Sequence, residues 1–220
     1  MAYKIFDQNA ERYDSWYQRH PILFECEAKV LKELNIIGRG LSIGVGTGIL
    51  DSKASIEIGV DLAPNILRFA SDRGIIVIRA AAEYLPFRDR SFDFALMTTT
   101  LCFIDSPEEA IQEAKRVLRS EGKLIVCIVP RDSSWGEDYV KKAEAGNIFY
   151  RHAHFYTLSE LEDLLRRFSF KVTTVTATLS YPPSAKPHIE EPSENPKSKG
   201  FVCIKAVNTS RFNEINKSVL

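Results

Sequence analysis

A glycine-rich turn between two short apolar runs constrains the fold of this chain most strongly. Gly44, Gly46 and Gly48 follow one apolar run in a Gly-x-Gly-x-Gly pattern, and the next apolar run, residues 56–60, directly precedes Asp61. Short, nearly continuous apolar runs are typical of parallel strands that are buried on both faces. Glycine permits both a tight strand-to-helix turn and close approach of a ligand to the backbone. The pattern therefore predicts an α/β protein with the glycines and Asp61 at the carboxyl ends of neighbouring strands.

The spacing of the glycines separates this turn from a dinucleotide-binding fingerprint. Ile49 stands where the third glycine of G-x-G-x-x-G would fall. The Asp61 carboxylate is suited to accept both hydroxyls of a ribose, whereas its structural alternative is to cap a helix that opens at Pro64. For the glycines alone, an ordinary tight turn is the alternative interpretation. Together with Asp61, they favour a ligand that contains a nucleoside.

Composition sets further bounds on the chain. Its 220 residues, 45% of them hydrophobic, are enough for one domain with a sizeable core. Lys plus Arg equals Asp plus Glu at 29 each, so no net charge favours nucleic acid or an anionic membrane, and neither partner is expected. Neither a signal peptide nor a long apolar segment is evident, which predicts a cytoplasmic protein. The cysteines lack a C-x-x-C pair and are predicted to be reduced, mostly buried thiols: Cys26, Cys102, Cys127 and Cys203.

Alternation of strand and helix patterns predicts the architecture. A helical segment over 6–34 comes first, and helices are then predicted at 64–73, 107–119 and 158–168, the last two opened by capping boxes at Ser106 and Thr157. Strands are predicted at 41–45, 56–60, 75–78, 92–98, 123–129, 172–179 and 201–207. This order predicts a Rossmann-like, doubly wound, mostly parallel seven-stranded sheet with helices on both faces.

We expect a single domain over 1–220 that is divided into functional segments. These are an N-terminal helical cap (1–37), a cofactor-binding core (38–130), a substrate lid (131–156) and a C-terminal helix and strands (157–220) with a mobile surface loop at 181–199, which holds five prolines. The lid is predicted because aromatic residues gather directly after a strand, although plain packing is the alternative. These aromatic residues are Trp135, Tyr139, Phe149, Tyr150, Phe155 and Tyr156.

A longer phrase downstream of the turn gives the pattern a family resemblance. Residues 82–93 read A-E-Y-L-P-F-R-D-R-S-F-D. With the glycine turn and Asp61, this phrase resembles class I S-adenosylmethionine-dependent methyltransferases over about residues 38–130. Within them the chain is similar to the small-molecule branch, methyltransferase type 11, which includes ubiquinone and menaquinone biosynthesis enzymes. The resemblance implies methyl transfer by in-line displacement from S-adenosylmethionine to a small-molecule acceptor, with S-adenosylhomocysteine as the product.

The resemblance also implies where the cofactor binds. The turn would face the cofactor backbone, Asp61 would bind ribose, and the following strand ends would hold adenine and the sulfonium. Two tyrosines of the N-terminal helix would close over the methionine part. The implied residues are Gly44, Gly46, Thr47, Gly48, Asp61, Leu62, Ala82, Glu83, Thr98, Thr99, Tyr13 and Tyr17.

Two residues depart from the family pattern. Ser42 stands where an acidic residue often precedes the glycines, and Ala81 stands where an Asp usually takes the adenine amino group. Loss of such a contact costs about 1–3 kcal/mol if nothing replaces it. These departures favour one alternative, a cofactor-binding or regulatory module without methyl transfer. A nicotinamide-dependent oxidoreductase is a third interpretation, disfavoured by Ile49 and by the lack of a Tyr-x-x-x-Lys pair.

The catalytic base is not specified by these patterns. His152 and His154 are weak candidates, because a hydroxyl or ammonium acceptor has to lose a proton. A metal site at this pair is not predicted, since no third ligand lies nearby in the sequence. The acceptor and the oligomeric state are not predicted either.

Overall fold

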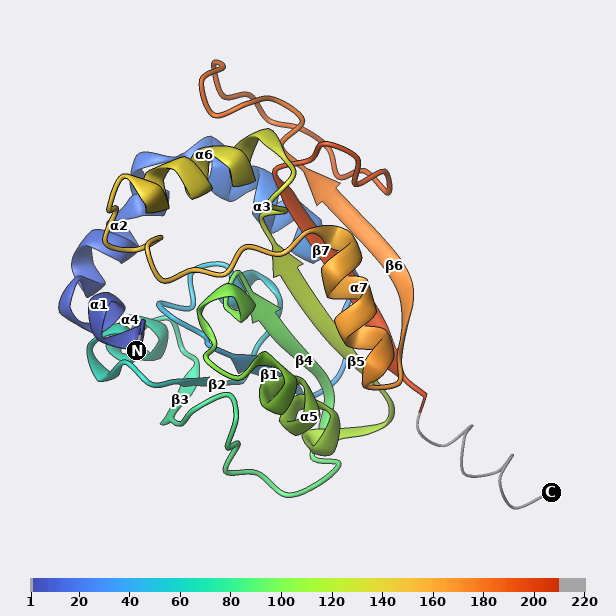
Figure 1. Cartoon of the computed structure of the whole chain (residues 1–220). Helices are drawn as coiled ribbons and strands as arrows, with labels where there is room; N and C mark the ends of the chain where they lie inside the picture. Colours follow the sequence, from blue (N-terminus) through green and yellow to red (C-terminus); the bar gives the residue numbers. More distant parts are fainter. Residues whose placement is uncertain (1, 210–220) are drawn as a thin grey trace.

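The computed structural model describes residues 2–209, which form a seven-stranded sheet flanked by helices (Figure 1). The strand order is β3-β2-β1-β4-β5-β7-β6. The strands are β1 (Gly40–Ile43), β2 (Ile58–Asp61), β3 (Ile76–Arg79), β4 (Phe92–Thr98), β5 (Leu118–Ile128), β6 (Phe170–Thr178) and β7 (Phe201–Asn208). The first five pair in parallel, and β7 is antiparallel to both β5 and β6. The predicted Rossmann-like, mostly parallel sheet is confirmed.

The strand order creates a crevice at β1 and β4. From β1 the chain winds outward through β2 to β3 and then returns to place β4 on the opposite side of β1. Connections therefore leave the carboxyl ends of β1 and β4 in opposite directions, which opens a ligand-binding crevice between them. The glycine turn follows β1, and Asp61 ends β2 beside it.

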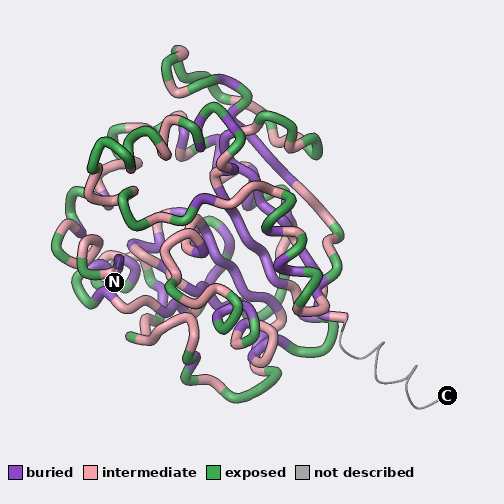
Figure 2. Tube along the Cα trace, in the orientation of Figure 1, coloured by how far each residue is buried: buried purple, intermediate pink, exposed green. Residues whose placement is uncertain are grey.

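Helices cover both faces of the sheet, so its central strands are buried (Figure 2). On one face, α5 (Pro107–Val117) and α7 (Leu158–Arg167) contribute to a core cluster; on the other, α3 (Pro21–Glu33) and α4 (Pro64–Asp72) do so. Alternate residues of β4 point to opposite clusters, with Ala95 in the first and Leu96 in the second.

The start of each helix can be compared with its predicted signal. Thr157 and Glu160 form the predicted capping box of α7. The capping box predicted at Ser106 is wrong, because the Ser106 side chain makes no capping hydrogen bond. Proline at the first position of α5 supports this start instead. This helix ends at Val117, two residues earlier than predicted, because Leu118 already pairs with Phe92 in the sheet.

The helices of two regions differ from those predicted from the sequence. The N-terminal segment divides into α1 (Tyr3–Gln8), α2 (Ala10–Arg19) and α3, with breaks at Asn9 and His20. The predicted lid region contains α6 (Ser134–Glu144), which the sequence analysis did not predict. The Ser133 side chain caps α6 by accepting a hydrogen bond from the Gly136 amide.

Tertiary contacts overturn the expectation that all four cysteines are thiols. Cys127 of β5 lies directly opposite Cys203 of β7, with 4.0 Å between their Cα atoms, and the two form a disulfide. The strand register brings them together although they are 76 residues apart in the chain. Cys26 and Cys102 are free.

The proline-rich segment 181–199 lies against the body of the protein rather than free of it. It has no helix or strand, as predicted, but Trp135 of α6 donates a hydrogen bond to the Tyr181 carbonyl at 2.6 Å. Lys29 of α3 forms an ion pair with Glu191, and Ser193 pairs with Ala177 of β6. These contacts anchor the segment at both α3 and the sheet edge, which composition alone could not indicate.

Candidate active site

The three positions of the turn require glycine for different structural reasons. All have positive φ angles, between +54° and +72°. A Cβ on Gly44 would lie 2.0 Å from Thr100, and one on Gly48 would lie 2.7 Å from Ile75, so both glycines are required by packing. A Cβ on Gly46 would meet only Tyr13 at 3.8 Å and would otherwise project into open space. Gly46 is therefore the glycine whose missing side chain leaves room for a ligand.

Asp61 is held rigidly beside this turn. One of its carboxylate oxygens accepts a hydrogen bond from the Gly46 amide and the other from the Ala63 amide, both at 3.0 Å. Burial raises the pKa of the Asp61 carboxyl, although these amide bonds oppose the shift. Each oxygen keeps further acceptor capacity, so the carboxylate can accept hydroxyl hydrogens of a ligand. The bond to Ala63 at the start of α4 also fulfils the capping alternative, and the two roles are compatible.

A second acidic residue lies in the turn region and was missed by the sequence analysis. Asp51 is 4% exposed, and its carboxylate accepts a 2.5 Å hydrogen bond from the Ser42 hydroxyl. Burial raises the pKa of Asp51 to about 7, with a further contribution from the nearby charge of Asp61. Its position three residues after the last glycine was a usable signal. The structure thus places a carboxyl group directly beside Ser42, the position where the family pattern often has an acid.

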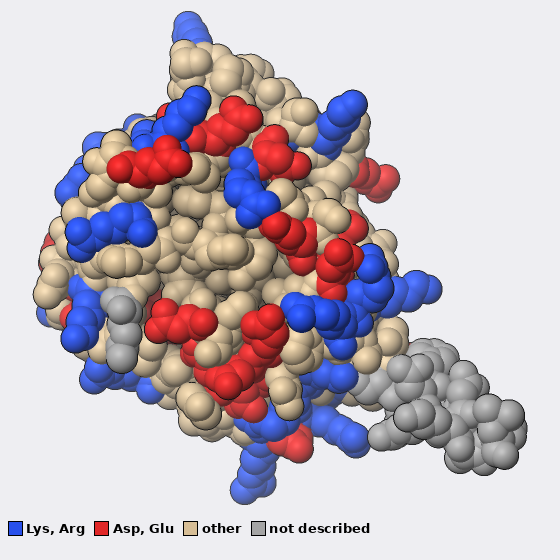
Figure 3. Space-filling model, viewed as in Figure 1, with Lys and Arg blue, Asp and Glu red and all other residues tan. Residues whose placement is uncertain are grey.

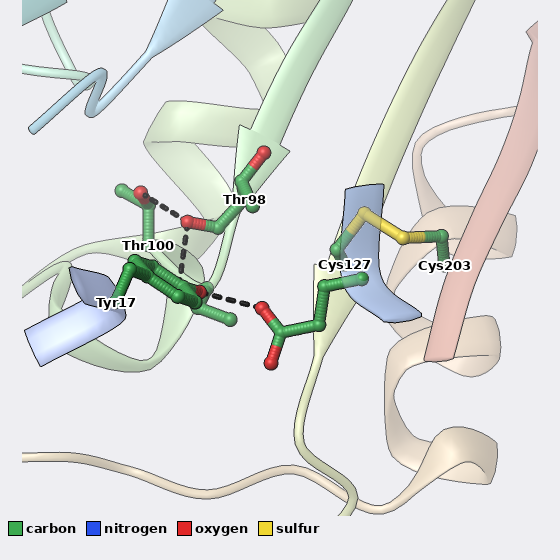
Figure 4. The surroundings of a disulfide bond; sticks show 7 residues. Tyr17, Thr98, Thr100, Cys127 and Cys203 are labelled. Atoms are coloured by element: carbon green, nitrogen blue, oxygen red, sulfur yellow. Dashed lines mark hydrogen bonds between the residues drawn. A yellow bond between two sulfur atoms is a disulfide. The ribbon is translucent and has the colours of Figure 1, made fainter. Parts of the chain in front are cut away.

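The end of β4 completes the crevice. The Thr100 hydroxyl donates a hydrogen bond to the Gly44 carbonyl at 2.8 Å, which ties the end of β4 to the glycine turn. It also donates to the Thr98 carbonyl at 3.2 Å (Figure 4). Thr99 has a φ of +52°, which is rare for a β-branched residue and strains the backbone. Such strain gathers at binding sites and active sites.

These elements enclose a first cavity of about 150 Å³. It includes every cofactor-binding residue predicted above. The predicted residues that line this cavity are Gly44, Gly46, Thr47, Gly48, Asp61, Leu62, Ala82, Glu83, Thr98, Thr99, Tyr13 and Tyr17. After the third strand, Ala80 and Ala82 line the cavity, whereas Ala81 is not part of its lining.

A second cavity of about 280 Å³ adjoins the first. Its walls come from α2, α3, the end of β5 and the segment around α6, and the face that holds it has uncharged atoms at its centre with charged side chains around them (Figure 3). The two cavities share Phe6, Tyr13, Tyr17, Thr99 and Phe103. Five aromatic residues of the predicted lid line it: Tyr139, Phe149, Tyr150, Phe155 and Tyr156. The sixth, Trp135, is instead buried in the core.

The second cavity also contains a buried carboxyl group. Glu27 of α3 is 6% exposed, and its carboxylate accepts a 2.5 Å hydrogen bond from the Tyr17 hydroxyl (Figure 4). Burial raises the pKa of Glu27 to about 7, and burial also raises the pKa of Tyr17. No sequence pattern indicated this role, because Glu27 is one of several acidic residues in a helix.

The structure does not support His152 or His154 as a catalytic base. Both are exposed, and neither lines either cavity. His152 accepts a hydrogen bond from the Arg151 side chain at 3.2 Å, and the His154 ring packs against Tyr156. Residues 151–156 form a turn and an irregular segment.

The residues of the first cavity fit a cationic nucleoside ligand such as S-adenosylmethionine. Four acidic residues line the cavity, and none of them is in an ion pair within residues 2–209: Asp51, Asp61, Glu83 and Asp105. S-adenosylmethionine offers ribose hydroxyls, an ammonium group and a sulfonium. The cradle at Gly46, the hydrogen-bonding capacity of Asp61 and these uncompensated carboxyl groups match that set of groups.

Comparisons with known proteins agree with this geometry. Residues 41–126 match a family model described as a methyltransferase domain. A solved SAM-dependent methyltransferase from Thermotoga maritima, described as a possible histamine N-methyltransferase, is 39% identical, covers 94% of this chain and 100% of its own, and superposes with a TM-score of 0.90. The chain belongs to the class I S-adenosylmethionine-dependent methyltransferases. It is accordingly an enzyme that uses S-adenosylmethionine.

Two curated relatives mark the range of this similarity. An uncharacterised protein of Methanocaldococcus jannaschii is 40% identical over 202 residues, which are 92% of this chain and 98% of the relative. A malonyl-[acyl-carrier protein] O-methyltransferase of Marinomonas is 28% identical over 168 residues, 71% of this chain and 61% of the relative. In the part of the chain that is described, no helix is long and apolar enough to cross a membrane.

Proposed function

We propose that this enzyme methylates a small molecule that binds in the second, aromatic cavity. The observation that carries the proposal is the shared wall: Tyr13, Tyr17 and Thr99 belong to both cavities. A molecule in the aromatic cavity would therefore contact the boundary of the cofactor cavity. The volume of about 280 Å³ suits a small metabolite and leaves little room for a macromolecular segment.

The first cavity is proposed to hold the cofactor with Asp61 at the ribose hydroxyls. Leu62, Ala82 and Glu83 would lie at the adenine, and Thr98 and Thr99 near the reactive end. Asp51 is proposed to pair with the ammonium group of the methionine part, in place of the acid that Ser42 replaces. A buried carboxylate that lacks a protein cation is stabilised by such a partner.

Positioning is the main contribution expected from the protein. When bound, the cofactor supplies a methyl group already activated by a positively charged sulfur. The aromatic walls exclude water from the acceptor, and the strained Thr99 fixes the boundary between the cavities. Holding two reactants in line lowers the barrier by up to about 7–11 kcal/mol in favourable systems.

The segment 131–156 is proposed to act as the lid of the acceptor site. Tyr139 and Tyr150 stack with their ring centroids 4.4 Å apart. The ring centroid of Phe149 lies 6.0 Å from that of Tyr13 in the N-terminal cap. The lid and the cap therefore meet over the cavity through aromatic rings. We expect that opening this aromatic contact would admit the acceptor.

Turnover distinguishes this proposal from a non-catalytic cofactor-binding module. The enzyme is incubated with S-adenosylmethionine labelled in the methyl group and a panel of small amines, phenols, acids and thiols. Labelled product with at least one of them supports the proposal. If calorimetry shows S-adenosylhomocysteine binding while no acceptor of any class is methylated, the module interpretation is favoured instead.

A further inference from the structure

From the aromatic cavity we infer that the acceptor carries a protonated amine, which Glu27 and the surrounding aromatic rings recognise. This inference rests on the proposed function, because it names the chemical class of the molecule that the second cavity binds. It concerns recognition of the ammonium group, whichever atom of the acceptor receives the methyl group.

The first argument is the electrostatic state of Glu27. Glu27 is only 6% exposed, and it lines the cavity. Within residues 2–209, the only hydrogen bond to its carboxylate comes from the Tyr17 hydroxyl. A carboxylate in such a place is costly unless a cation compensates it. The protein supplies none, so the missing cation is a group that a ligand can bring.

The cations at the cavity wall have other partners. The Lys142 ammonium pairs with Asp138 at 2.7 Å and lies 5.4 Å from the Tyr139 ring centroid. Arg19 donates a hydrogen bond to Ser15, and Arg12 lies over the Phe149 ring. None of them forms an ion pair with Glu27 among the described residues. The titratable groups whose charges act on Glu27 or respond to it are three tyrosines from α2, α6 and the following segment: Tyr17, Tyr139 and Tyr150.

The second argument is the aromatic wall itself. Tyr17, Tyr139 and Tyr150 line the same cavity as Glu27. The ring centroid of Phe155, a further lining residue, lies 6.3 Å from the ring centroids of both Tyr139 and Tyr150. Ring faces attract cations through their quadrupole, most strongly where water is excluded, and cages of aromatic rings are a known means of binding ammonium groups. A carboxylate and aromatic rings in one cavity thus favour the same ligand charge.

The same arrangement disfavours anionic acceptors. A carboxylate or phosphate in the cavity would face Glu27 in a poorly solvated place, where like charges repel strongly. A neutral acceptor would leave the Glu27 charge unpaired. Of the three charge classes, only a cation improves the energy of the buried carboxyl group.

The test compares three probes of nearly the same shape: 2-phenylethylamine, 2-phenylethanol and 3-phenylpropionate. Their binding to the full chain saturated with S-adenosylhomocysteine is measured by calorimetry at pH 8, which lies above the Glu27 pKa of about 7. The amine is expected to bind at least about tenfold more tightly than the alcohol, and the acid more weakly still. Equal affinities, no binding of the amine, or a preference for the acid would overturn the inference.

Two variants locate the preference. Glu27→Gln keeps the shape of the side chain and is expected to remove the preference for amine over alcohol, while S-adenosylhomocysteine binds as before. Glu25→Gln makes the same change at an exposed position of the same helix and should leave the preference intact. An amine preference that persists in Glu27→Gln would also overturn the inference.

Methyl transfer separates this inference from the proposed function. If the alcohol or the acid is methylated and the amine is not, the proposed function holds and the inference is wrong. If the amine binds through Glu27 but nothing in the panel is methylated, the amine site stands and small-molecule methyl transfer is the part that fails.

Discussion

Replacing Asp51 by Asn should make the ligand-free enzyme more stable and its cofactor binding weaker. The pKa of Asp51 in the fold is about 7, against an ordinary value of 3.8. Because the folded state holds the Asp51 proton more tightly than the unfolded state does, the contribution of Asp51 to stability is fully present below pH 3.8. This contribution is lost as the pH rises through about 7. A shift of about 3 pH units corresponds to about 4 kcal/mol of lost stability at pH 8.

An asparagine at this position carries no charge and keeps an acceptor oxygen for the Ser42 hydroxyl. Part of the 4 kcal/mol should therefore be recovered at pH 8, on the order of 1–3 kcal/mol. For a chain of this size, this raises the melting temperature by roughly 2–4 °C per kcal/mol. Thermal unfolding of the ligand-free variant and wild type at pH 8 measures the difference.

Cofactor affinity should change in the opposite direction. If the ionised Asp51 pairs with the ammonium group, wild-type affinity for S-adenosylhomocysteine falls roughly 50-fold from pH 7 to pH 5, as the carboxyl group with a pKa of about 7 takes up a proton. Asp51→Asn should bind about 10- to 100-fold more weakly at pH 7 and show a flatter pH dependence. Asp72→Asn, at an exposed site of α4, serves as the control.

Calorimetry across this pH range decides the matter. Parallel pH profiles for wild type and Asp51→Asn, or unchanged affinity at pH 7, would refute the pairing of Asp51 with the ammonium group. A variant that is less stable than wild type at pH 8 would refute the assignment of Asp51 as an uncompensated buried acid.

Three further predictions concern the cradle and the sheet. Asp61→Asn should weaken S-adenosylhomocysteine binding by at least about tenfold, because an amide cannot accept hydrogen bonds at both of its ends; unchanged affinity by calorimetry would contradict this. Gly46→Ala should reduce cofactor affinity with only about 1 kcal/mol of lost stability. Gly44→Ala should destabilise the fold more, since its Cβ would lie 2.0 Å from Thr100. Denaturant unfolding compares the stability of the two variants, and equal losses would count against the distinction. Reduction of the Cys127–Cys203 disulfide should lower stability by about 2–4 kcal/mol, measured as a lower melting temperature with dithiothreitol that is absent in a Cys127→Ser/Cys203→Ser variant.

Much of the fold could be predicted because its signals are local. Phe92–Thr98 was predicted to the residue as a strand, since a run of buried apolar residues is legible in the sequence itself. The helix at Pro64 was predicted to within one residue from its first-turn proline and the glycine after it. Capping at Ser106 failed because a side-chain hydrogen bond depends on rotamers and neighbours as well as on residue type.

The candidate site divides in the same way. The cofactor cavity follows from a glycine turn and Asp61, which lie within 20 residues of each other on consecutive strands. The acceptor cavity joins α2, α3, α6 and the segment after α6. Glu27 and Tyr139 line one cavity only because α3 and α6, which are far apart in the chain, both border it. Histidines near the aromatic cluster in sequence were plausible, yet the chain turns both outward.

By itself, the sequence determined the order of the seven strands, the turn at the glycines and the class of cofactor, because these depend on neighbouring residues and on backbone conformation. The tertiary structure decided which buried carboxyl groups have no ion-pair partner among residues 2–209: Asp51 beside Ser42, and Glu27 within the aromatic cavity. It also decided the pairing of Cys127 with Cys203. Burial and register are properties of chain segments brought together over long separations, and a carboxyl group acquires its chemistry from what surrounds it in space.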